Sequence, residues 1–137
     1  MSETAEWGNV CSRVDTCALT GAAAFFTGIK GAEVLVNGPL WCYFYALRHL
    51  EKSNSRLGER FHGSQPDNNA VVYGTEECLT DALDYIRENR APSILLIENS
   101  CSVSLIGDDI EGIAAKAKLP FSVMGMDSGG LSGGFAE

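Results

Sequence analysis

Short apolar runs alternate along this chain with longer amphipathic segments, and this alternation limits the fold more than any other feature. Four runs are short, rich in β-branched or aromatic residues and bounded by Gly, Pro or Asn: Glu33–Val36, Ala70–Tyr73, Ser93–Ile97 and Phe121–Gly125. Four segments have helical character: Ala18–Gly28, Leu40–Lys52, Thr75–Glu88 and Asp109–Lys118. Strands that alternate with helices pair in parallel through crossover connections. We therefore expect an α/β fold, a three-layer Rossmann-like domain with a mainly parallel sheet.

Two of the predicted helices carry clear start signals. Thr75 can cap the third helix, and Asp108 or Asp109 can cap the fourth, because short polar side chains accept hydrogen bonds from the free amides of a first turn. The intervening segment Ser53–Asn69 is polar and interrupted by Gly and Pro. We expect a long irregular loop there, of a length that is often functional.

Length and composition indicate one globular domain spanning residues 1–137. Hydrophobic residues make up 45% of the 137 residues and charged residues 20%, which is typical of a folded chain that needs no disulfides. The longest apolar runs are too short to span a bilayer, and the polar N-terminus lacks the features of a secretory signal. A net charge of −8 argues against nucleic-acid binding. We expect a cytoplasmic protein with neither a membrane nor a nucleic acid as partner.

Three of the five cysteines occupy similar places in this predicted fold. Cys17 opens the first helix, Cys42 follows the Gly38-Pro39 turn at the start of the second, and Cys101 comes just after a strand. Helix amino ends lower the pKa of a thiol, and parallel sheets bind ligands beyond the carboxyl ends of their strands. These positions suit a soft-metal site, although cysteines also serve simply to fill a core. Without a Cys-x-x-Cys pair, the spacing alone leaves both interpretations open.

The remaining candidates favour structural roles. We expect Cys11 to be an exposed thiol and Cys78 to pack within its helix, while His49 and His62 lie on the surface. The glycines of segment 129–134 do not follow a phosphate-binding pattern, so we interpret them as flexible backbone near the site. No residue stands out as catalytic.

The segments around the three cysteines resemble the nitrogenase component 1 type oxidoreductase family, which includes reductases of chlorophyll and coenzyme F430 biosynthesis. The resemblance is carried by 17–31, by 36–42 and by 99–110, in which Ile106-Gly-Asp-Asp109 begins five residues after Cys101. In that family, three cysteines of each chain ligate an iron–sulfur cluster at a subunit interface. The resemblance extends over essentially the whole chain and implies its N-terminal cluster-binding domain, without the later domains.

The resemblance implies a function as well. Cys17, Cys42 and Cys101 are the expected metal ligands of a 4Fe-4S or P-cluster-like iron–sulfur cluster, and Gly38 and Pro39 shape the cofactor-binding turn. The expected partners are a second component 1 type subunit, or another copy of this chain, and an ATP-dependent iron–sulfur reductase that donates electrons. The chain would relay electrons in an oxidoreductase complex and be inactive alone. The alternative is a cluster-free α/β domain that binds a protein or small ligand and has structural cysteines.

Overall fold

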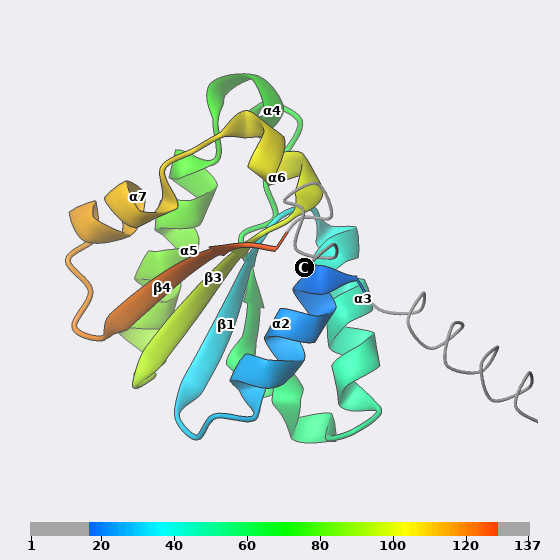
Figure 1. Ribbon diagram of the computed structural model, residues 1–137. Helices are drawn as coiled ribbons and strands as arrows, with labels where there is room; N and C mark the ends of the chain where they lie inside the picture. The colour runs from blue at the N-terminus through cyan, green and yellow to red at the C-terminus, as the bar shows by residue number, and fades with distance from the viewer. Residues whose placement is uncertain (1–16, 129–137) are drawn as a thin grey trace, which may run out of the picture.

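A four-stranded, all-parallel sheet forms the centre of the molecule (Figure 1). The computed structural model describes residues 17–128. The strand order is β2-β1-β3-β4, so β1 and β3 form the middle of the sheet. The strands are β1 (Ala32–Asn37), β2 (Phe61–Gly63), β3 (Ile94–Asn99) and β4 (Ser122–Asp127).

Helices cover both faces of this sheet. The helices are α2 (Ala18–Thr27), α3 (Leu40–Glu51), the 3-10 helix η1 (Ser55–Arg60), α4 (Ala70–Tyr73), α5 (Glu76–Asn89), α6 (Cys101–Ile106) and α7 (Ile110–Lys116). One core cluster joins α2 and α3 to Val34, Val36 and Leu96, and a second joins α5 and α7 to Leu35, Leu95 and Ile97. The expected three-layer α/β architecture is confirmed. Within residues 17–128, no helix is both long enough and apolar enough to span a bilayer.

Two predictions about the middle of the chain are wrong. Ala70–Tyr73 is the short helix α4 and not a strand, because Asp67 Oδ1 accepts hydrogen bonds from the amides of Asn69 (3.0 Å) and Ala70 (3.1 Å) and so starts a turn. Gly74, with φ of +95°, then ends it. This local capping outweighs the strand preference of the β-branched residues in the segment.

Strand β2, which we did not predict, lies inside the segment that we expected to be an irregular loop. Strand β2 pairs with β1 through Phe61, which is buried and stacks on Tyr43 with ring centroids 5.3 Å apart. Arg60, just before β2, donates hydrogen bonds to three carbonyls of the connection between α2 and β1, the shortest of them 2.6 Å to Thr27. A three-residue strand gives almost no periodic signal, so only these tertiary contacts define it.

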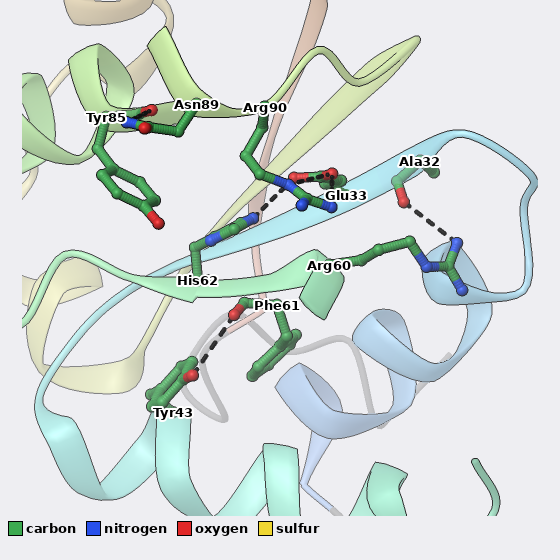
Figure 2. A network of polar contacts seen from close by, with 9 residues as sticks. All are labelled: Ala32, Glu33, Tyr43, Arg60, Phe61, His62, Tyr85, Asn89 and Arg90. Carbon is green, nitrogen blue, oxygen red and sulfur yellow. Dashed lines mark hydrogen bonds and ion pairs between the residues drawn. The ribbon is translucent and has the colours of Figure 1, made fainter. Parts of the chain in front are cut away.

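His62 of β2 belongs to a partly buried ion-pair network instead of lying freely on the surface (Figure 2). Its Nε2 is 2.7 Å from Glu33 Oε2, while Arg90 donates from Nε and Nη2 to Glu33 Oε1 at 2.9 and 2.7 Å. Glu33 lies on a fully buried strand, where an unpaired carboxylate would be very costly. This network therefore compensates a buried charge and ties β2 and the end of α5 to β1.

Candidate functional site at the carboxyl edge of the sheet

Three cysteines lie at the amino ends of three different helices. Cys17 is the N-cap residue of α2, Cys42 is the third residue of α3, and Cys101 is the first residue of α6. Both α3 and α6 start just after a parallel strand, β1 and β3 respectively, so their cysteines lie at the carboxyl edge of the sheet. Helix α2 also begins at this end (Figure 1).

Cys42 is coupled electrostatically to both other cysteines. The pKa of Cys42 is raised first by burial and then by repulsion from Cys17 and from Cys101. Such repulsion between like charges falls off with distance and is screened by water, so it marks neighbouring groups. Cys17 and Cys101 are exposed whereas Cys42 is half-buried, so the group opens to the surface.

Cys78 lies apart from this group. Its Sγ donates a hydrogen bond to the carbonyl of Thr75 at 3.1 Å, inside α5. Its pKa is raised by burial and, more weakly, by Asp67 and Asp81, with no contribution from another cysteine. The predicted packing role of Cys78 fits this environment, and the residue serves below as a matched control.

The loops that carry Cys42 and Cys101 touch each other at Gly38. A Cβ atom at position 38 would lie 2.5 Å from Cβ and 2.6 Å from Oγ of Ser100, far inside van der Waals contact. The amide of Ser100 also donates to the carbonyl of Asn37 at 3.1 Å. Only glycine permits this approach, so Gly38 brings the β1–α3 loop against the residue that precedes Cys101. Pro39 follows as the N-cap residue of α3, in extended conformation.

A buried polar network fixes the strand ends beneath these loops. Asn37 Nδ2 donates to Asn99 Oδ1 and to Thr75 Oγ1, both at 3.1 Å, and Asn37 Oδ1 accepts from Ser64 at 2.7 Å. Asp108 Oδ2 in turn accepts from the amide and hydroxyl of Thr75 at 2.6 and 2.8 Å. Satisfied buried networks of this kind rigidify what they hold. Sequence analysis missed Asn37, Asn99 and Ser100. Their one signal is that they lie at the end of a hydrophobic strand or directly after it.

The acidic pair and the other candidates keep structural roles. Asp109 caps α7 by accepting from the amide of Gly112 at 3.0 Å, as predicted. Asp108 holds the start of α5 through Thr75, and Thr75 itself makes no side-chain cap there. His49 is exposed on α3, as expected. Cys11 and the glycine segment 129–134 lie outside the described residues.

The donor set consists of three thiols, and thiolates are the ligands that hold iron–sulfur clusters in proteins. Within residues 17–128, no group of three or more His, Cys, Asp or Glu side chains is close enough to hold one metal ion. In a polynuclear cluster, each cysteine binds its own iron, so the thiolates need not meet at a single point. Three soft donors at positive helix ends, two of them exposed, match that requirement.

Comparison with known proteins shows which family this chain resembles. The family model described as nitrogenase component 1 type oxidoreductase matches residues 17–137. The chain is 29% identical over 121 residues to the nitrogenase iron-molybdenum cofactor biosynthesis protein NifE of Methanosarcina barkeri, covering 85% of this chain and 26% of that protein. It is 33% identical over 110 residues to the nitrogenase molybdenum-iron protein alpha chain of the same organism, covering 74% and 20%.

Solved structures agree with the sequence relatives. Nitrogenase Cp1 at pH 5 superimposes with a TM-score of 0.71 and 26% sequence identity, over 85% of this chain and 26% of that chain. The similarity therefore includes the sheet and helices described above. The chain spans about a quarter of the length of the proteins that it matches.

Proposed function

This chain belongs to the nitrogenase component 1 type oxidoreductase family, and from that premise we propose that Cys17, Cys42 and Cys101 hold an iron–sulfur cluster. The chain would act as the electron-relaying domain of a larger oxidoreductase complex. The observation that carries this proposal is that the three cysteines lie at the amino ends of α2, α3 and α6, at one edge of the sheet. A bound cluster would supply a site that accepts and releases single electrons.

The protein's own residues would bind and orient this group. Cys17 and Cys101 present exposed thiols, while half-buried Cys42 lies deeper and would fix the cluster against the protein. Gly38 and Pro39 would set the distance between the second and third ligands, because they shape the loop that touches Ser100. Substrate reduction would take place outside this chain, in other parts of the complex.

An exposed aromatic surface supports a protein partner beside the site. Trp41 and Tyr45 are 68% and 67% exposed, and Leu40 and Phe44 on the same helix are exposed as well. The rings of Trp41 contact those of Phe44 and Tyr45, with centroids 6.4 and 6.2 Å apart. Exposed apolar patches of this kind usually mark interfaces. We assign this surface to a second component 1 type subunit or another copy of this chain, with an ATP-dependent iron–sulfur reductase as electron donor.

Anaerobic reconstitution of the chain with iron and sulfide tests the ligand assignment. We expect stoichiometric iron and sulfide in the wild-type protein, and loss of both in Cys17→Ala, Cys42→Ala and Cys101→Ala. Cys78→Ala is the matched control, because it also removes a half-buried thiol at a helix start but lies outside the group. A colourless wild-type protein without iron, or equal losses in all four variants, would instead support the cluster-free domain.

A further inference from the structure

Strand β4 is an outer strand of the sheet with an open edge. Within residues 17–128 it pairs only with β3 (Figure 1). The other outer strand, β2, is three residues long, whereas β4 has six residues and contains neither Pro nor Lys. Native proteins protect sheet edges with short strands or with these residues, because a row of unpaired amides and carbonyls is a template for another strand. The edge of β4 therefore lacks this protection.

Apolar side chains accompany this open edge. A groove with a volume of about 510 Å³ lies between α7 and β4, and Ile110, Phe121 and Val123 are among the residues that line it. On the strand itself, Met124 is 44% exposed, whereas every residue of β1 is buried. A strand added beside β4 would cover the unpaired backbone together with these apolar side chains, and both effects favour association.

Charged groups of opposite sign lie at the two ends of this groove. Glu111, in the first turn of α7, lies over the carboxyl half of β4, because a Cβ atom at Gly125 would be 3.6 Å from its Cγ. Lys118 lies at the other end, in the connection that leads from α7 into β4. Asp127 is exposed at the carboxyl end of the strand. Among the described residues, Glu111, Lys118 and Asp127 have no ion-pair partner.

We propose that a second copy of this chain pairs its β4 antiparallel to β4 of the first, around a twofold axis perpendicular to the sheet. Such an axis places the amino end of each strand beside the carboxyl end of the other and keeps both α7 helices on the same face. Lys118 of each copy then approaches Glu111 and Asp127 of the other copy, so the edge is complementary to itself. Parallel pairing of the two copies would instead bring like charges together.

Analytical ultracentrifugation of the chain under reducing conditions tests this interface. We expect a monomer–dimer equilibrium in the wild-type chain, and at least about tenfold weaker association in Lys118→Glu, because two attractions become two repulsions. The double variant Lys118→Glu/Glu111→Lys exchanges the two charges and should recover the wild-type association. Lys30→Glu is the matched control, because it makes the same change of net charge at an exposed position between α2 and β1.

Two further measurements locate the contact on β4. Met124→Lys places a charge on the open edge and should abolish the dimer, whereas Val72→Lys, at an exposed apolar position on α4, should not. Amide hydrogen exchange in β4 should become slower as the concentration of the wild-type chain rises, because pairing gives its outward-facing amides an acceptor.

Three results would overturn this inference. The first is a wild-type chain that stays monomeric up to about millimolar concentration. The second is a dimer that Lys118→Glu leaves unchanged, or a double variant that does not regain association. The third is a dimer that Trp41→Glu dissociates and Met124→Lys does not, because association would then use the aromatic surface of α3. All three leave the cluster-binding proposal intact, since iron content tests that proposal separately.

Discussion

Substituting Gly38 by Ala tests whether the contact between the two cysteine loops holds the site together. The new Cβ would lie 2.5 Å from Ser100 Cβ, whereas carbon atoms in van der Waals contact are about 3.5–4.0 Å apart, so the loops must separate by about 1 Å. Overpacking of this kind costs about 1–3 kcal/mol. We expect a loss near the upper end, because the atoms met belong to a short side chain next to the backbone.

Urea unfolding of the apo chain measures this cost, with Gly21→Ala as the matched control. A Cβ at Gly21 meets nothing within 4 Å, and Gly21 lies on an exposed position of α2, so alanine there should stabilise the protein by up to about 1 kcal/mol. The same substitution is thus expected to change stability in opposite directions at the two positions.

A double-mutant cycle identifies the contact itself. Ser100→Gly removes both atoms that the new Cβ would meet, and Ser100 makes no side-chain cap to α6. Gly38→Ala combined with Ser100→Gly should therefore recover most of the lost stability, and with it the iron content that Gly38→Ala alone lowers. Wild-type stability in Gly38→Ala, or no coupling between the two substitutions, would refute the reasoning.

Three further predictions concern buried charges and caps. Burial raises the pKa of Glu98 from 4.5 to about 8 in the folded state, so the stability of the wild-type chain should fall as pH rises through that range. Glu98→Leu removes this loss and should therefore stabilise the apo chain increasingly from pH 5 to 8, by at most about 5 kcal/mol. Denaturant titrations at several pH values check this. Arg90→Met should lower the stability by about 2 kcal/mol, because Glu33 then keeps only His62 as a partner. This loss lies between the values typical of surface and of buried ion pairs. A loss below about 0.5 kcal/mol in chemical unfolding would contradict this. Asp108→Ala should cost about 1–2 kcal/mol by releasing the Thr75 amide, and hydrogen exchange should show it at the start of α5.

The central strands could be predicted because each is a continuous apolar run in a buried parallel sheet. Strands β1 and β3 match the predicted ranges within two residues at each end, and helices α2, α3 and α5 match theirs as closely. Their core contacts repeat along the segment, so the sequence pattern carries the signal. Strand β2 and helix α4 were not predicted, for the opposite reason. A three-residue strand and a four-residue helix have too few residues for a repeating pattern, and the hydrogen bonds of Arg60 and Asp67 define them instead.

The cysteine positions were predictable at the level of the helix ends, but the contacts around them were not. That Cys42 and Cys101 share one edge follows from their place after buried strands. The approach of Gly38 to Ser100 depends on β1 and β3 being neighbours, with Asn37 opposite Asn99. Glu98 escaped attention because the predicted strand ended at Ile97, whereas β3 continues to Asn99. A charged residue after an apolar run indicates a strand end unless tertiary packing extends the strand over it.

The strand order explains why the site lies between β1 and β3. From β1 the chain crosses through α3 to β2, and from β3 it crosses through α6 and α7 to β4, in the opposite direction along the sheet. Helix α3 belongs to one core cluster and α7 to the other, so the two connections diverge toward opposite faces. Parallel α/β sheets bind ligands at such a switch point, beyond the carboxyl ends of the strands. Because Gly38 and Ser100 meet at this point, the pairing of β1 with β3 positions the loops that carry Cys42 and Cys101. Cluster binding would then use a preformed site, in contrast to small zinc domains, in which metal-binding energy is also folding energy.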